Sequence, residues 1–314
     1  MSDFVTQAGP LRDLVERELS NLFTPAGLLT DADVPPGLAE PMRYALLGGG
    51  KRLRPVLCLA VCQALCGDPE RALPAALAIE TLHNYTLVHD DLPCMDDDEF
   101  RRGRPTVHAK YGYGQAVLVG DALQAAAFAL VLTPPKGRRL WVGAQLRIAR
   151  TLAQYAGPAG VVGGQWVDVT SEPPHDEARI EFVHTHKTGD LIHCAAAMGA
   201  IAAGGTTAQI LSASKFGRSL GIAFQLVDDV LDGDDPAKAD ELSVLRICSK
   251  EEALQRARTH TDRALEALDE LDPPAGRFDS CADESAAETD GANRRREAVA
   301  LLRALAESQI SRTV

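Results

Sequence analysis

The spacing of apolar residues constrains the fold of this 314-residue chain more than any other feature. Leucine, alanine and valine recur three and four positions apart, as in a helix that buries one face, and no stretch of useful length alternates as a half-buried strand would. We therefore expect an all-α fold, a single helical domain over residues 1–314. The segments with the helical pattern are 56–66, 73–88, 115–132, 191–203 and 211–231.

One stretch near the C-terminus lacks this pattern. Residues 272–295 are polar, rich in small side chains and aperiodic. Such a composition buries too little apolar surface to offset the entropy of ordering. It predicts a flexible insertion before a last helix at about 296–310.

The composition excludes some classes of partner and location. A net charge of -12 argues against nucleic acid, which needs a surplus of lysine and arginine. The N-terminus shows no secretory signal, and the most apolar segment, 115–132, contains Asp121 and Gln124, so we expect no transmembrane helix. Seven cysteines, an odd number, favour reduced thiols in a cytoplasmic protein.

Three of the cysteines share one helical face. Cys58, Cys62 and Cys66 are spaced four residues apart. They could be metal ligands, but small buried residues explain the spacing better.

Two acidic clusters lie far apart in the chain, each joined to an apolar helix. The first, HDDLPCMDDDEFRRGR, covers 89–104, and the second, FQLVDDVLDGDD, covers 224–235. Asp228 and Asp232 are four apart and share a helix face. Carboxylates directed at one another require cations between them, and oxygen ligands suit Mg²⁺, which is often held together with phosphate oxygens. Two facing clusters therefore predict a Mg²⁺ site for a diphosphate.

Basic residues accompany these clusters. The segment GGGKRLRP, 48–55, is a glycine-rich turn in which Lys51, Arg52 and Arg54 precede or open a helix, a position that favours anions. Arg101 and Arg102 follow the first acidic cluster, and the segment HKTGD, 186–190, adds a lysine and a threonine. Each group alone is common on protein surfaces. Together they predict a site for polyanions in an acidic protein.

In their order and approximate spacing these motifs resemble the trans-isoprenyl diphosphate synthases, with the bacterial farnesyl/geranylgeranyl type most similar. The resemblance runs from about 40 to 232 and resumes weakly near 250–270 and 297–312. It implies the isoprenoid synthase type of helical bundle, with the active-site cavity between helices. The segments that carry it are GGGKRLRP, HDDLPCMDDDEFRRGRPTVH, GDALQ, GGQWVDV, HKTG and FQLVDDVLD.

The resemblance also implies roles for individual residues. Three Mg²⁺ ions are expected with bound diphosphate, and the implied metal ligands are Asp90, Asp91, Asp96, Asp168, Asp228, Asp229 and Asp232. The other implied contacts of the allylic diphosphate are Arg101, Lys187, Thr188 and Gln225. The implied pocket for isopentenyl diphosphate consists of Lys51, Arg54, His83 and Arg102. The residues expected to carry catalysis are Asp90, Asp91, Asp96, Arg101, Lys187 and Asp228.

The implied activity is condensation of isopentenyl diphosphate with dimethylallyl or geranyl diphosphate by Mg²⁺-assisted ionisation.

 The helix before the first aspartate motif carries Tyr85 and Thr86 about one turn below the metal site, where the growing chain descends. In the family a bulky aromatic side chain here resembles a floor that stops elongation. We therefore expect farnesyl diphosphate as product and geranylgeranyl diphosphate as the alternative. The family also implies a homodimer.

One region departs from the family pattern. After the second aspartate motif the chain is about ten residues shorter than the family's loop, and Glu241 replaces a lysine that closes over the allylic diphosphate, with Lys238 the nearest basic residue. This departure leaves open a weakly active chain or a non-catalytic partner subunit.

Two other enzyme classes share part of the pattern. Glu80-x-x-His83 and Glu181-x-x-His184 are typical of ferritin-like di-iron bundles, but that reading leaves both aspartate clusters unexplained. A terpene cyclase would use similar metal chemistry, but it needs no pocket for isopentenyl diphosphate. The segment GGGKRLRP and the second arginine of RRG indicate such a pocket and so disfavour a cyclase.

Overall fold

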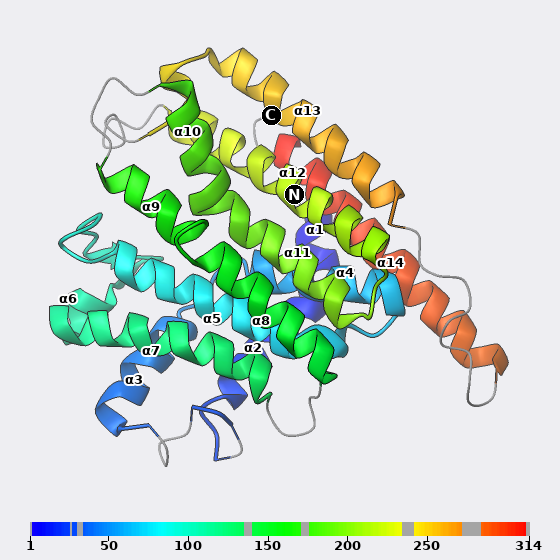
Figure 1. Ribbon diagram of the computed structural model, residues 1–314, viewed down its shortest axis with the longest axis horizontal. Coiled ribbons are helices and arrows are strands. Elements are labelled where there is room, and N and C mark those ends of the chain that lie inside the picture. Colours follow the sequence, from blue (N-terminus) through cyan, green and yellow to red (C-terminus); the bar gives the residue numbers. More distant parts are fainter. Residues whose placement is uncertain are drawn as a thin grey trace.

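The computed structural model describes residues 2–25, 27–29, 34–134, 140–170, 176–233, 242–271 and 284–311, and these residues are overwhelmingly helical (Figure 1). The α-helices before the middle of the chain are Ser2–Gln7 (α1), Gly9–Asn21 (α2), Pro36–Leu46 (α3), Leu53–Cys66 (α4), Leu73–Asp90 (α5), Val107–Tyr111 (α6) and Tyr113–Leu132 (α7). Those that follow are Val142–Ala156 (α8), Val161–Thr170 (α9), Glu177–Val183 (α10), Asp190–Ala202 (α11), Thr207–Asp232 (α12), Lys250–Asp269 (α13) and Glu284–Ser311 (α14).

Short elements complete the described chain. Phe100–Arg101 (β1) and Arg104–Pro105 (β2) form a two-stranded antiparallel hairpin. The remaining helical turns are Pro69–Ala72 (η1) and Val244–Arg246 (η4), both 3₁₀, and the π-helical turn His184–Gly189 (η2).

Helix α11 lies in the middle of the bundle and packs against α4, α8 and α12. All of its residues except His193 are buried, as an all-apolar helix requires. Close approach to α4 depends on Gly199, because a Cβ at this position would lie 2.3 Å from the carbonyl oxygen of Cys58. In Figure 1, α5 and α7 run side by side, and this pair also packs closely.

The expected all-α fold is confirmed. The five predicted helical segments correspond to α4, α5, α7, α11 and α12, with boundaries that differ by a few residues. The prediction for the C-terminus is wrong in part. Helix α14 begins at Glu284, twelve positions before the predicted start, so the residues 284–295 are helical despite their weak apolar pattern. The rest of the expected insertion, 272–283, lies outside the described residues.

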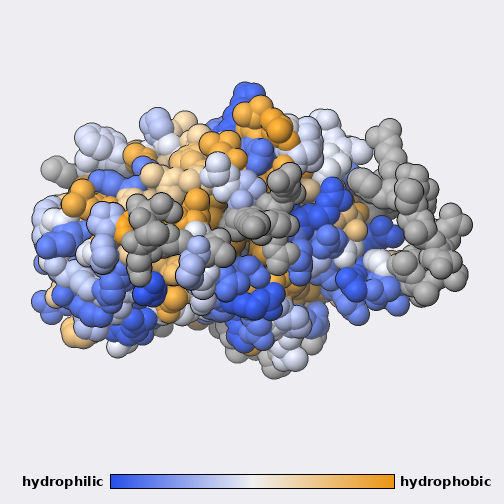
Figure 2. Space-filling model, turned by 90° about the horizontal axis from the view of Figure 1, so that it is seen from below, coloured by the Kyte–Doolittle hydropathy of each residue, from blue (hydrophilic) through white to orange (hydrophobic). Residues whose placement is uncertain are grey.

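Helix α7 is long and apolar enough, by length and composition, to cross a membrane. One of its faces packs against α5, which is the ordinary reason for such a composition in a core helix. The other face of α7 exposes the apolar side chains of Leu118 and Leu132, and α8 exposes those of Val142 and Leu146. Figure 2 shows hydrophobic side chains gathered between hydrophilic areas on one face of the molecule.

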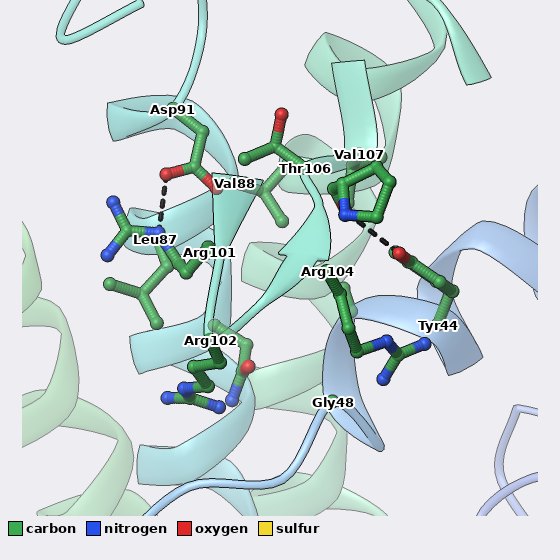
Figure 3. Close-up of a pocket in the computed structure, with 13 residues that line it drawn as sticks. Tyr44, Gly48, Leu87, Val88, Asp91, Arg101, Arg102, Arg104, Thr106 and Val107 are labelled. Carbon is green, nitrogen blue, oxygen red and sulfur yellow. Dashed lines mark hydrogen bonds and ion pairs between the residues drawn. The ribbon is translucent and has the colours of Figure 1, made fainter. Parts of the chain in front are cut away.

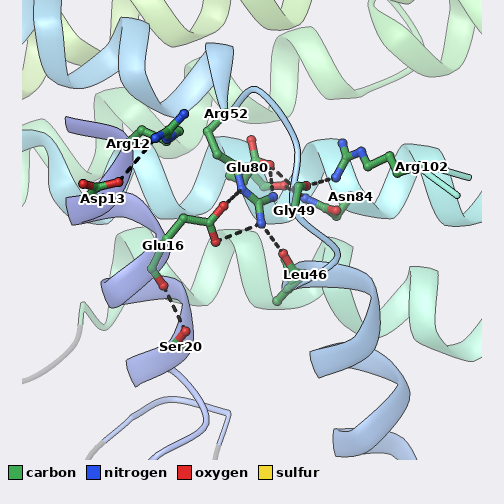
Figure 4. A network of polar contacts seen from close by, with 10 residues as sticks. All are labelled: Arg12, Asp13, Glu16, Ser20, Leu46, Gly49, Arg52, Glu80, Asn84 and Arg102. Atoms are coloured by element: carbon green, nitrogen blue, oxygen red, sulfur yellow. Dashed lines mark hydrogen bonds and ion pairs between the residues drawn. The ribbon is translucent and has the colours of Figure 1, made fainter. Parts of the chain in front are cut away.

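The start of α4 is fastened by a buried arginine (Figure 4). The Arg52 side chain is fully buried and donates to Glu80 of α5 at 2.5 Å, to Glu16 of α2 at 2.7 Å and to the Leu46 carbonyl oxygen at the end of α3 at 2.7 Å. Its backbone adopts a left-handed conformation, with φ of 49°. A non-glycine residue in this region costs free energy, so the surrounding contacts must hold it there.

We predict that Glu80→Ala lowers the free energy of unfolding by about 3–5 kcal/mol, because it leaves the Arg52 charge buried beside a vacated partner position. Glu16→Ala should cost only about 1 kcal/mol, because its side chain is about a third exposed (36%) and water can replace the carboxylate. Urea titration of both variants measures the two losses. Equal, small losses would show that the buried pair does not hold the start of α4.

Candidate active site

The first aspartate cluster lies where α5 ends and the chain reverses. Asp90 is the last residue of α5, and the backbone N–H of Asp96 donates to its carbonyl oxygen at 2.9 Å. The β1–β2 hairpin follows, with positive φ at both Arg102 and Gly103, as a two-residue turn of type I′ requires. This turn carries Arg102 back to the glycine-rich loop, where its guanidinium donates to the Gly49 carbonyl oxygen.

The hairpin also returns an arginine to the first aspartate cluster. Arg101 donates to Asp91 at 2.5 Å and to Asp98 at 3.1 Å. Figure 3 shows Asp91 and Arg101 facing each other beside a small cavity of about 50 Å³, with Tyr44 across from them and its hydroxyl donating to Pro105. Sequence reasoning missed Asp98, although it belongs to the same acidic run.

A lysine from a distant segment completes this region. Lys187, in η2, donates to Asp168 of α9 at 2.5 Å. The two segments approach closely because Gly164 has no side chain: a Cβ there would lie 2.4 Å from the Lys187 backbone nitrogen. The structure therefore brings the HKTG and GGQWVDV segments together.

The pKa shifts indicate that this lysine lies among several carboxylates. Burial raises the pKa of Asp90 to about 7, Lys187 opposes the shift, and Asp96 adds to it. Burial also raises the pKa of Asp96, again opposed by Lys187 and reinforced by Asp168. For Lys187 itself burial lowers the pKa, but Asp168, Asp90 and Asp96 together raise it above its usual value. Three carboxylates thus share one ammonium group.

A separate cationic cavity of about 550 Å³ lies next to the glycine-rich loop. It is lined by all four residues of the implied isopentenyl diphosphate pocket: Lys51, Arg54, His83 and Arg102. The lining also includes Arg52, Glu80 and Phe224, which sequence reasoning did not assign to it.

The ionisation of this cavity is set by burial and by its arginines. Arg54 lies 3.2 Å from the His83 ring nitrogen Nε2. Burial, followed by Arg54 and Arg102, lowers the pKa of His83 well below its usual value, so the imidazole is neutral at pH 7. Burial lowers the pKa of Arg54 to about 10, and Asp228 acts in the opposite direction, which places that carboxylate within electrostatic range of the cavity.

The second aspartate motif divides its carboxylates between two directions. Asp229 is buried, and its oxygens accept hydrogen bonds from Gln225 at 2.9 Å and from the Val244 backbone at 2.6 Å, with His184 at 3.2 Å. Protein groups thus engage both oxygens of Asp229, and its role as a metal ligand stays a prediction. The Gln225 side chain, a predicted contact of the allylic diphosphate, donates its hydrogen bond to Asp229. Asp228 and the exposed Asp232 remain on the helix face expected for ligands.

The donor set suits a hard divalent ion. Among the described residues, no three His, Cys, Asp or Glu side chains converge to form a complete metal site. The carboxylates nevertheless lie within electrostatic range of one another: Asp96 raises the pKa of Asp90, and Asp168 raises that of Asp96. All three raise the pKa of Lys187. Oxygen ligands with uncompensated negative charge fit Mg²⁺ held jointly with phosphate oxygens.

The di-iron alternative is contradicted. Glu80 is bound by Arg52 at 2.5 Å and by Asn84 at 3.2 Å, and His83 lies against Arg54, so the first Glu-x-x-His pair is engaged elsewhere. His184 of the second pair lies against Asp229.

Other predicted residues occupy ordinary positions. Tyr85 is buried, and its ring meets His89 edge-on at 5.2 Å between centroids. The Thr86 hydroxyl donates to the His83 carbonyl oxygen at 2.8 Å. Thr188 lies half-buried in η2, next to Lys187. Lys238 and Glu241 of the shortened loop lie outside the described residues.

Comparison with known proteins identifies relatives over most of the chain. A geranylgeranyl pyrophosphate synthase of Catharanthus roseus is 41% identical over 74% of this chain and 69% of its own length. The heterodimeric geranylgeranyl pyrophosphate synthase large subunit 1 of Arabidopsis thaliana is 45% identical over 62% of this chain, which spans 53% of that protein. The crystal structure of a FPP/GFPP synthase from Zymomonas mobilis superposes with a TM-score of 0.81 at 31% identity, covering 98% of this chain and 100% of that one.

These relatives correct one prediction. The expected cytoplasmic location is contradicted, because the two plant relatives are named as chloroplastic enzymes. The family itself is shown by a direct match: residues 35–240 fit the model of the polyprenyl synthetases. With this match, and with relatives above 40% identity, the chain belongs to the polyprenyl synthetase family.

Proposed function

We propose that the protein is a prenyltransferase that condenses isopentenyl diphosphate with an allylic diphosphate. The observation that carries this proposal is the pairing of two anion sites of different character. One gathers Asp90, Asp96 and Asp168 around Lys187, and the other is a cavity lined by Lys51 and arginines. One site suits a metal-bound diphosphate and the other a diphosphate held by cations alone.

The allylic diphosphate would bind at the carboxylate site. Bound Mg²⁺ would supply charge compensation as the diphosphate leaves. Lys187 and Arg101 are placed to hold the same leaving group, because both already lie against carboxylates of this site. Asp229, fixed by Gln225 and His184, would keep α12 and its Asp228 in register.

Isopentenyl diphosphate would bind in the cationic cavity. Lys51, Arg54 and Arg102 would bind its diphosphate, and the neutral His83 would donate a hydrogen bond without adding charge. Its double bond would attack the allylic carbon as the C–O bond breaks, a C–C bond would form, and a proton would be lost. The released diphosphate can accept that proton, so we assign no side chain as general base.

We propose geranylgeranyl diphosphate as the product, on the names of the plant relatives. A specific observation favours farnesyl diphosphate as the second candidate. Tyr85 is bulky and lies on α5, five positions before Asp90. Burial, and then the charge of Asp90, raise the pKa of its hydroxyl. Such a side chain could stop the growing prenyl chain near the carboxylate site.

We propose a homodimer that uses the exposed apolar face of α7 and α8. Leu118 and Leu146 are each 62% exposed, and exposed apolar patches of this kind commonly bind partners. The Arabidopsis relative is named as a heterodimer subunit, so a different partner chain is the alternative.

The carboxylate site can be tested directly. Asp90→Ala or Asp228→Ala should lower kcat by about 10²–10³-fold, because each removes a group that helps to hold the metal and the leaving diphosphate. Asp262→Ala, an exposed position on α13, is the control and should keep full activity. A radiolabelled condensation assay with Mg²⁺ measures all three. Full turnover by a folded Asp90→Ala variant contradicts the two-site proposal, and an inactive wild-type chain would favour the partner-subunit alternative.

Product length tests the role of Tyr85. If its ring is the floor, Tyr85→Ala should shift products toward longer chains, because the space below the carboxylate site opens. Thr86→Ala tests the smaller of the two predicted chain-length residues and should shift the products less. Chromatography of the dephosphorylated products measures the distribution. A less stable variant with an unchanged product ratio would make Tyr85 an ordinary core residue.

The proposed dimer can be tested with a charge on its apolar face. Leu118→Glu should convert a dimer to a monomer, because two buried carboxylates would face each other across the twofold axis. Leu211→Glu, on the distant α12 and 57% exposed, is the control. Light scattering after gel filtration reports the mass of each. A Leu118→Glu protein that remains dimeric excludes this face.

A further inference from the structure

A second cationic cavity, of about 470 Å³, lies among α10, η2, α12 and α13. It shares no lining residue with the cavity at the glycine-rich loop. One part of its wall is apolar and consists of Ile180, Ile222, Leu226, Val244 and Ile247. The polar part includes Glu181, Thr185, Arg218, Thr259, His260 and Arg263.

The polar part carries surplus positive charge. Arg256 also lines the cavity, but it is paired with Glu177 and Glu252, each at 2.8 Å. Arg218 and Arg263 make no ion pair with any described residue, and both are exposed. Burial, and then Arg263 and Arg218, lower the pKa of His260, so both guanidinium groups lie within electrostatic range of one ring.

This surplus is unusual in a chain with a net charge of -12. Arg218 and Arg263 outnumber Glu181, the lining carboxylate, so the cavity attracts anions, and arginine binds phosphate through two parallel hydrogen bonds. The apolar wall suits a hydrocarbon chain, and the volume lies within the usual range of about 300–1,000 Å³ for small-molecule sites. An anionic head joined to an apolar tail would satisfy both parts.

We propose that this cavity, the α12–α13 cavity, binds a prenyl diphosphate at a site separate from the catalytic one. The diphosphate would contact Arg218 and Arg263, and the tail would lie along the isoleucine and leucine side chains. The choice of a prenyl tail rests on the proposed function, because that reaction makes and consumes molecules of this class.

A ligand in this cavity would affect the catalytic site through the contacts of His184. His184 lines the cavity, and its ring nitrogen lies 3.2 Å from the Asp229 carboxylate. His184 and Thr185 also begin η2, the turn that carries Lys187. A ligand that shifts His184 would therefore alter the positions of Lys187 and α12, so bound product would slow turnover.

Binding of a geranylgeranyl thiolodiphosphate, an analogue that resists ionisation, to the full chain tests the proposal. In the presence of a chelator the carboxylate site loses its metal, and saturating isopentenyl diphosphate occupies the cavity at the glycine-rich loop. The α12–α13 cavity needs no metal, so calorimetry should then detect one remaining site per chain. Arg218→Gln with Arg263→Gln should weaken this metal-independent binding by about tenfold for each arginine. Arg258→Gln, an exposed arginine of α13 outside the cavity, is the matched control and should bind as the wild type does.

Turnover provides the second measurement. Product inhibition of the wild type should have a component that excess substrate does not overcome, and the double arginine variant should lose it without change in the initial rate. Unchanged metal-independent binding in the double variant, or no such binding in the wild type, overturns the proposal. A wild type that binds the analogue without metal but does not condense substrates refutes the proposed function and leaves this site intact.

Discussion

The buried Arg52 guanidinium holds the cationic cavity in place. It joins α2, the end of α3, the start of α4 and α5 through Glu16, Leu46 and Glu80. Lys51 and Arg54 flank it in sequence, so their positions depend on the same contacts. A buried arginine with one partner removed is costly, which makes this junction cooperative: all of its contacts form together or the glycine-rich loop is misplaced. The shape of the cavity therefore depends on a structural ion pair whose two residues also line it.

The carboxylate site follows a different logic. Its aspartates are brought together by the end of α5, by α9 and by η2, and Lys187 compensates them, with Arg101 acting in the same direction on Asp90 and Asp96. Burial raises the pKa of Asp90 to about 7, so the fold holds this carboxylate in a state that a cation would relieve. Such a site lowers the stability of the fold and attracts a cation. The neighbouring cavity, lined by arginines, attracts an anion without a bound cation. This difference between the two sites is the basis of the proposal that they hold two diphosphates in different modes.

The same helix end that serves the site also connects to a second surface. Asp229 points away from the carboxylate site toward His184 and Val244, and the α12–α13 cavity begins there. Adjacent residues of one motif thus face two regions because they lie about 100° apart around a helix. The motif letters alone do not distinguish these two environments, and only the fold shows that protein groups engage Asp229.

The sequence by itself determined the helical class, the approximate bounds of the main helices and the residue types of both anion sites, because apolar spacing and charge clusters are local properties of the chain. Only the tertiary structure decided that Lys187 meets Asp168, that Arg52 is bound by Glu80 and Glu16, and that protein groups engage Asp229. It also showed that α14 begins at Glu284, earlier than the weak local pattern predicts. These outcomes depend on which helix faces approach one another, and small residues such as Gly164 and Gly199, whose neighbours lie far away in the sequence, set that approach.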